Sequence, residues 1–208
     1  MYIRKKILFL LPLIFSLTVL SSDIEEIIVK GEYREKSLGE EDSSIVIIQS
    51  EQIKSQAIKH FQQLSHLVPN LNYAASDSRA RYFQIRGIGE RSGYQGTPNS
   101  SVGFLIDDID YSGQGGIATL FDVDQVEVFR GPQGSRSGAN ALAGLIYIKT
   151  KDPTEKFEGT SELTLGDYGT QNIGIAFGGP MQNKKLKYRL VLRTDYADGF
   201  RKNTYLNK

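Results

Sequence analysis

The chain has 208 residues, a formal net charge of +1 and no cysteine. So small a charge removes the bulk electrostatic argument for nucleic-acid binding. The lack of cysteine excludes disulfides, thiolate metal sites, cysteine nucleophiles and an N-terminal lipoprotein anchor. A content of 39% hydrophobic and 24% charged residues excludes an all-helical membrane protein and a plainly disordered chain.

The first 22 residues are organised like a secretory signal peptide. Three bases within residues 1–6 precede fourteen uncharged residues, 7–20. A helix of that length reaches about 21 Å at about 1.5 Å per residue, which is short of the roughly 30 Å hydrocarbon core of a bilayer. The pattern predicts export from the cytoplasm and cleavage near Ser21 or Ser22, with an uncleaved anchor as the alternative.

Residues 23–42 are predicted to form a flexible leader. The segment is densely charged around Gly31 and Gly39, a composition that cannot bury a core. Residues 27–29 are its one apolar, β-branched run. Such a run can add a strand to an exposed sheet edge of a partner through backbone hydrogen bonds. The alternative is a few stray apolar residues in a linker.

Residues 43–153 are predicted to form an α+β domain, a small mixed sheet with short helices and glycine-rich loops. Apolar and β-branched runs predict strands at residues 44–48, 82–86, 102–109, 125–129 and 145–150. A helix is expected from Ser50 to about residue 67, because apolar residues recur there at helical spacing. A short helix is also expected at Leu120 and Phe121.

Polar loops are predicted at residues 74–81, 90–101 and 112–116, and a tight glycine-rich loop at residues 131–144. The tight loop is no phosphate cradle, because Gly138 is followed by Ala and Asn instead of Lys and Ser or Thr. It is no nucleophile elbow either, since Arg136 stands where the serine would be needed. The two histidines do not share a helix face. We therefore expect neither an enzyme nor a metal or cofactor site.

The remaining residues, 154–208, are predicted to form three strands of about 8–11 residues in a meander. Ile173, Ile175 and Phe177, for example, alternate with small residues. In an exported chain this pattern predicts transmembrane β-barrel strands with one face toward lipid. An ordinary half-buried antiparallel sheet is the alternative, and periodicity does not separate the two.

Four stretches are distinctive when taken together. They are residues 25–31 (Glu-Glu-Ile-Ile-Val-Lys-Gly), 84–89 (Gln-Ile-Arg-Gly-Ile-Gly), 124–134 (Asp-Gln-Val-Glu-Val-Phe-Arg-Gly-Pro-Gln-Gly) and 138–153. The sequence resembles the N-terminal part of a TonB-dependent outer-membrane receptor, with signal peptide, TonB box, plug domain and first barrel strands. It departs from the family pattern at residues 135–137 and at Ala139, where many members carry Arg.

The resemblance implies an α+β plug lodged in a large bacterial outer-membrane barrel. Such receptors import scarce solutes, commonly ferric siderophores or cobalamin. The energy comes from the inner-membrane proton gradient through TonB and its energising complex. The implied partners are TonB, the outer membrane and a small-molecule substrate such as an iron chelate, without nucleic acid.

The resemblance also implies roles for single residues. TonB would bind Glu26, Ile27, Ile28, Val29 and Lys30. Arg86 and Arg130, at predicted strand ends, would pair with acidic residues of the barrel wall, since a guanidinium can bind a carboxylate through two hydrogen bonds. Tight turns are expected at Gly87, Gly131, Pro132, Gly134, Gly138 and Gly144. Weaker candidates for contact with an anionic or catechol-like chelate are Arg79, Arg81, Tyr82, Arg91, Tyr94, Gln95 and Tyr111, with mobile surface loops as the alternative.

Three strands are too few for a barrel. Bacterial barrels need at least about eight strands and plugged transporters have about 22. An open sheet in lipid leaves unpaired edges, each costing several kcal/mol per backbone group. We therefore expect an N-terminal fragment of a transporter, in the first place for a ferric siderophore-type complex. The competing hypothesis is a secreted plug-like binding module without transport activity.

Overall fold

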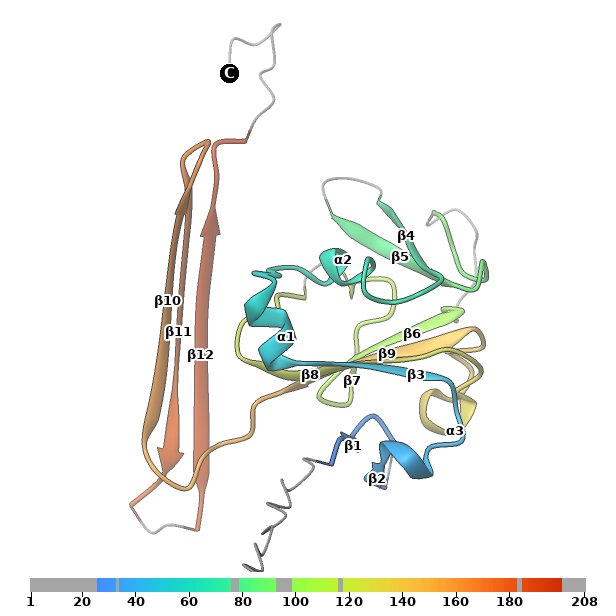
Figure 1. The fold of residues 1–208 in the computed structure, drawn as a ribbon, viewed down its shortest axis with the longest axis horizontal. Helices are drawn as coiled ribbons and strands as arrows, with labels where there is room; N and C mark the ends of the chain where they lie inside the picture. Colours follow the sequence, from blue (N-terminus) through green and yellow to red (C-terminus); the bar gives the residue numbers. More distant parts are fainter. Residues whose placement is uncertain are drawn as a thin grey trace, which may run out of the picture.

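The computed structural model of the chain describes residues 26–32, 34–75, 79–92, 99–115, 118–182 and 185–199. The predicted signal peptide at residues 1–22 lies outside them. The leader is followed by a mixed α+β domain and by a separate sheet of three long antiparallel strands beside it (Figure 1). This arrangement confirms the predicted fold class, a plug-like α+β domain followed by antiparallel strands.

The plug domain is built on a five-stranded sheet with the order β3-β8-β9-β6-β7. Its strands are β3 (Ile45–Gln49), β6 (Val102–Ile106), β7 (Ile109–Asp110), β8 (Val123–Phe129) and β9 (Gly144–Thr150). β6 and β9 run parallel, and the other neighbours are antiparallel. β8 and β9 are covered on both faces, so their side chains alternate between two hydrophobic clusters.

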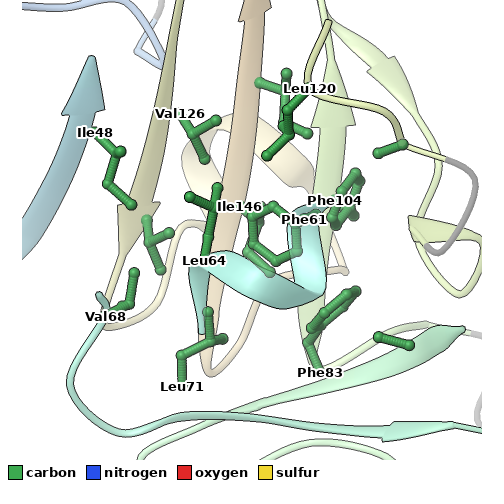
Figure 2. Packing of buried hydrophobic residues seen from close by; sticks show 14 of the residues in the cluster. Ile48, Phe61, Leu64, Val68, Leu71, Phe83, Phe104, Leu120, Val126 and Ile146 are labelled. Atoms are coloured by element: carbon green, nitrogen blue, oxygen red, sulfur yellow. The ribbon is translucent and has the colours of Figure 1, made fainter. Parts of the chain in front are cut away.

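The larger cluster lies on one face of this sheet. It is covered by α1 (Ser50–Ser55), α2 (Phe61–Leu64) and the hairpin of β4 (Leu71–Ala75) and β5 (Ala80–Ile85). Phe61 reaches from α2 toward Ile146 on the sheet (Figure 2). Its ring lies edge-on to Phe83 and Phe104, with centroids 5.1 and 5.3 Å away. Edge-to-face contacts of this kind add to the gain from area burial.

The smaller cluster lies on the opposite face, under the leader and α3. The covering elements are β1 (Ile28–Val29), β2 (Lys36–Ser37), the 3-10 helix η1 (Leu38–Glu40) and α3 (Gly134–Ser137). The buried residues are Val29, Leu105, Phe129, Ala141, Leu145 and Tyr147. The leader is thus packed below the sheet, on the side away from β4 and β5 (Figure 1).

The single helix predicted at residues 50–67 is wrong. The chain leaves helical geometry after α1, where Ala57 has a φ of +51°. It then runs extended, and the Leu120 amide donates to the Lys59 carbonyl at 3.1 Å. A backbone pairing with a distant segment has therefore replaced the helical hydrogen bonds, although both short helices still bury their apolar residues.

Three other local predictions also differ from the structure. β4 occupies the start of the loop expected at residues 74–81, because it pairs with β5 across the hairpin. α3 forms one helical turn inside the tight loop at residues 131–144. Leu120 lies in irregular backbone and Phe121 in the turn that follows, and neither is helical, since the neighbouring backbone pairs with the segment after α1.

The three C-terminal strands lie where the sequence predicted them. They are β10 (Glu158–Gly166), β11 (Thr170–Pro180) and β12 (Lys187–Tyr196), in that order and antiparallel. Gly174 and Ala176 are buried on the face toward the plug, whereas Ile173 and Ile175 are each 44% exposed on the other. The alternation therefore gives an apolar outer face and an inner face of small and polar residues. Within the described ranges, no helix is long and apolar enough to cross a membrane.

Candidate functional site

The predicted TonB-binding run is packed against the plug. Val29 is completely buried. The Ile28 carbonyl accepts a hydrogen bond from Gln125 Nε2 at 2.9 Å, and the Ile27 carbonyl accepts one from the Leu38 amide at 2.9 Å. The leader that we expected to be flexible therefore makes defined contacts, because one buried valine and several backbone groups find partners on the plug.

Glu127 holds the backbone of the leader from the middle of β8. Its Oε1 accepts the Lys30 amide at 2.6 Å and its Oε2 accepts the Gly31 amide at 2.8 Å. Gln125 Nε2 donates to the same carboxylate at 2.5 Å. The Lys30 ammonium lies 2.8 Å from Asp124 on the same strand. Two adjacent leader amides and one carboxylate thus form a single polar contact under an otherwise apolar segment.

The environment of Glu127 is unusual for a carboxylate. The residue is 0% exposed, and this burial raises its pKa above the ordinary value of 4.5. The hydrogen bonds from Lys30, Gly31 and Gln125 act in the opposite direction, because they favour the charged form. The three donors therefore offset part of the cost of burying the charge.

Gly31 allows this close approach. A Cβ at this position would lie 2.6 Å from the Phe129 ring and 2.7 Å from Glu127 Oε2. Sequence reasoning missed Glu127 and Gln125 as site residues. Their alternation with Val126 and Val128 was the available signal, since it places two polar side chains on one face of a central strand.

The two arginines assigned to the barrel wall differ in burial. Arg86 is exposed with a φ of +54°, and its amide donates to the Asn70 carbonyl at 3.0 Å. Arg130 is half-buried, and its amide donates to the Ser44 carbonyl at 2.8 Å. Arg130 Nε is fully buried and finds no hydrogen-bond partner among the described residues.

The predicted turn residues lie at sharp changes of chain direction. Gly87, Gly131, Gly138 and Gly144 have positive φ, Pro132 precedes α3, and Gly134 begins it. A Cβ at Gly144 would lie 2.3 Å from the Phe129 carbonyl oxygen, so β9 can approach β8 here only without a side chain.

Arg136, in the stretch that departs from the family pattern, contacts two parts of the plug. It pairs with Asp108 and lies 5.0 Å from the centroid of the Tyr147 ring. Burial raises the pKa of Tyr147 to about 12. Arg136 therefore connects α3 with β9 and with the turn before β7.

The candidate substrate contacts are only partly brought together. Arg81 Nε donates to the Gly113 carbonyl at 3.0 Å, which joins the β4–β5 hairpin to the loop that follows β7, and its guanidinium lies 5.6 Å from the Tyr82 ring. Arg79 Nη1 lies 3.4 Å from His60 Nδ1, and burial together with this cation lowers the pKa of His60. Arg91 is exposed. Tyr111 packs against the larger cluster. Tyr94 and Gln95 lie outside the described residues.

The plug contacts the three strands through residues that the sequence did not single out. Lys59 pairs with Glu162, and its Nζ donates to Thr164 Oγ1 at 2.8 Å. Asp122 pairs with Arg189 on β12. In the part of the chain that the structure describes, no three His, Asp or Glu side chains are grouped so that they could hold a metal ion.

Residues 37–145 match the family model of the TonB-dependent receptor plug domain. The match covers more than half of the chain, and the chain belongs to this family. Its members are bacterial outer-membrane receptors that act as transporters and not as enzymes. The resemblance drawn from the sequence motifs is confirmed.

Several receptors are similar to this chain over its N-terminal and plug regions. The pesticin receptor of Yersinia pestis is 24% identical over 192 residues, which cover 91% of this chain and 28% of the receptor. The ferric yersiniabactin uptake receptor of Yersinia pestis has a TM-score of 0.63 at 25% identity, covering 73% of this chain and 24% of that one. The pyoverdine outer membrane receptor of Pseudomonas aeruginosa shares the fold, with a TM-score of 0.69 at 20% identity, covering 83% of this chain and 25% of that one. This chain spans about a quarter of the length of these relatives.

Replacing Gly31 by Ala should release the leader from the plug. The added methyl group collides with Phe129 and Glu127, and overpacking of this kind costs about 1–3 kcal/mol. We expect faster hydrogen exchange of the Lys30 and Gly31 amides. Gly39→Ala is the matched control, because a Cβ there meets only Ser37 Oγ at 3.9 Å. Equal exchange in the two variants would show that the close approach at Gly31 does not hold the leader.

The raised pKa of Glu127 predicts a pH dependence of plug stability. Between the ordinary pKa of 4.5 and the raised one, the folded state binds more protons than the unfolded state. The contribution of Glu127 to stability is therefore largest below pH 4.5 and falls as the pH rises through the raised pKa.

Glu127→Gln isolates this effect. Denaturant unfolding is followed by far-ultraviolet circular dichroism from about pH 4 to about pH 7. The free energy of unfolding of the wild type minus that of the variant should decrease as the pH rises, because only the wild type titrates at this position. A difference that stays constant over this range would mean that the carboxylate titrates alike in both states.

Proposed function

We propose that this chain is the N-terminal part of a TonB-dependent transporter that is exported by its signal peptide and works in the bacterial outer membrane. The order of its segments carries this proposal. An apolar leader strand precedes a plug of the receptor family, and strands with an apolar outer face follow the plug. Energised uptake requires a TonB-binding segment, a plug and barrel strands, and the chain has candidates for these parts in this order.

The proposed substrate is a ferric siderophore-type complex. Two of the similar receptors are described by an iron chelate or its ligand, ferric yersiniabactin and pyoverdine. In this chain, Arg81 and Tyr82 belong to β5, which lies at the end of the plug away from the leader (Figure 1). Arg79 directly precedes β5, and Arg91 follows it in the chain. Cationic and aromatic side chains suit an anionic or catechol-like chelate. Tyr94, Gln95 and Tyr111 complete the proposed set.

The competing function is a secreted plug-like binding module. Leu163 and Leu165 on β10 are 66% and 71% exposed, and apolar residues also cover the outer faces of β11 and β12. An apolar surface of this kind is costly in water and stable against lipid. The outer face therefore favours the transporter over the secreted module.

The TonB-binding role of Glu26, Ile27, Ile28, Val29 and Lys30 is tested by Ile28→Pro. Proline removes an amide that strand addition to TonB would use. In the full-length transporter, we expect cross-linking to the periplasmic domain of TonB to disappear, together with energised uptake of a radiolabelled ferric chelate. Ile28→Val is the control, because it keeps the amide and the β-branched side chain. Normal cross-linking in the proline variant would remove the TonB-box assignment.

Arg86 and Arg130 are proposed to pair with carboxylates of the barrel wall. The unpartnered, buried Nε of Arg130 supports this role. Arg130→Ala would leave a wall carboxylate unpaired, which costs about 3–5 kcal/mol if that group is buried. In the full-length transporter, we expect increased permeability to large antibiotics and reduced uptake at near-normal surface abundance, with Arg130→Lys intermediate. Unchanged permeability and uptake would make Arg130 a residue of the Gly131 turn alone.

A further inference from the structure

The turn in front of β8 is fastened to the plug at both ends. The Leu120 amide donates to the Lys59 carbonyl at 3.1 Å, and the Asp122 carbonyl accepts the Lys151 amide at 3.1 Å. Leu120 is buried in the larger cluster. Asp122 has a φ of +61°, a conformation that aspartate tolerates better than most residues. Phe121 and Asp122 are thus presented from a fixed base toward the three strands.

Asp122 forms a bidentate ion pair with Arg189 on β12. Arg189 Nε and Nη2 donate to the two carboxylate oxygens at 2.5 Å each. The side chains are only 4% and 10% exposed. Because a guanidinium fork and a carboxylate must lie in one plane to make both bonds, the pair fixes direction as well as distance.

Phe121 fits a notch on the inner face of the strands. A Cβ at Gly174 on β11 would lie 2.8 Å from its ring, so the ring packs directly on the strand backbone. The Arg193 guanidinium of β12 lies 5.5 Å from the ring centroid, within the range of a cation–π contact. The ion pair of Asp122, the packing of the Phe121 ring on Gly174 and its cation–π contact with Arg193 therefore favour the same position of this turn.

On either side of this contact, cavities separate the plug from the strands. A cavity of about 460 Å³ lies between α1 and the inner faces of β10 and β12. A second cavity, of about 320 Å³, lies between the plug and Arg189 and Val191. Phe121 and Asp122 line both of them, so the turn stands between two hollows.

We propose that Phe121 and Asp122 form the seat that sets the orientation of the plug on the inner face of β11 and β12. On the strands, the seat contacts Gly174 of β11 and Arg189 of β12. The neighbouring Lys59–Glu162 pair is a lesser contact, because its side chains are 22% and 38% exposed and solvent weakens such pairs. The seat depends on neither TonB nor transport, so it stands or falls separately from the proposed function.

The test measures plug orientation directly. The full chain lacks cysteine, so Ser55→Cys on α1 and Asp167→Cys in the β10–β11 turn can carry two spin labels. In detergent, double electron–electron resonance on the otherwise unchanged chain should give one narrow distance. Asp122→Asn keeps the backbone conformation but removes the charge, and Gly174→Ala adds a methyl group against the Phe121 ring. Both should broaden or shift that distance, and Arg189→Lys should lie between them and the wild type.

Gly159→Ala on β10 is the matched control, because a Cβ there meets its neighbours at an ordinary 3.5 Å. Hydrogen exchange of the β8 and β9 amides shows in each variant whether the plug itself is still folded. A narrow, unshifted distance in both Asp122→Asn and Gly174→Ala would overturn the seat. If Asp122→Asn unfolds the plug, Gly174→Ala decides alone, since it changes only the strand side.

Discussion

The fold depends on β8 being buried on both faces while one of these faces is polar. Val126 and Val128 point into the larger cluster, which any central strand can do. Gln125 and Glu127 point the other way and are also buried. A buried carboxylate without donors would be strongly destabilising. The amides of Lys30 and Gly31 donate to the Glu127 carboxylate. This carboxylate therefore keeps these two donors only while the leader covers this face of the sheet.

Two ion pairs described between the plug and the strands differ in how far solvent reaches them, and this difference decides their roles. Exposed pairs such as Lys59 and Glu162 contribute about 0–1 kcal/mol. A buried pair such as Asp122 and Arg189 adds little net stability over apolar packing, but it excludes other arrangements because an unpaired partner is costly. Such a pair is therefore suited to define where the plug sits and less suited to hold it tightly.

The sequence was sufficient wherever a local period decided the structure. Alternation located β10, β11 and β12, and apolar runs located β3, β6, β8 and β9. The single strand predicted at residues 102–109 is wrong, because a turn at Asp107 and Asp108 divides it into the antiparallel pair β6 and β7. The sequence was insufficient where a distant segment supplied the partner. The predicted helix is interrupted where the Lys59 carbonyl accepts the Leu120 amide. The leader is docked because its Gly31 amide donates to Glu127, which lies 96 residues further along the chain. Neither partner is visible in a local window, so apolar spacing suggested a longer helix and composition suggested a free leader.

The same backbone groups that dock the leader would be required by the proposed TonB partner. Strand addition uses the carbonyls and amides of successive residues, and here the Ile27 and Ile28 carbonyls and the Lys30 amide already have partners. Docking on the plug and pairing with another sheet therefore compete for the leader.

Glu127 lies on β8, and the turn that precedes β8 carries Asp122, which contacts the three C-terminal strands. A pull on the docked leader would thus be applied to the strand next to the seat, and the outcome depends on whether the two amide–carboxylate bonds yield before the ion pair does. The two amide–carboxylate bonds act together with the buried Val29 side chain and with the Lys30–Asp124 ion pair, whose side chains are 26% and 36% exposed. The Asp122 and Arg189 side chains are only 4% and 10% exposed, so solvent weakens the ion pair of the leader more than the ion pair of the seat.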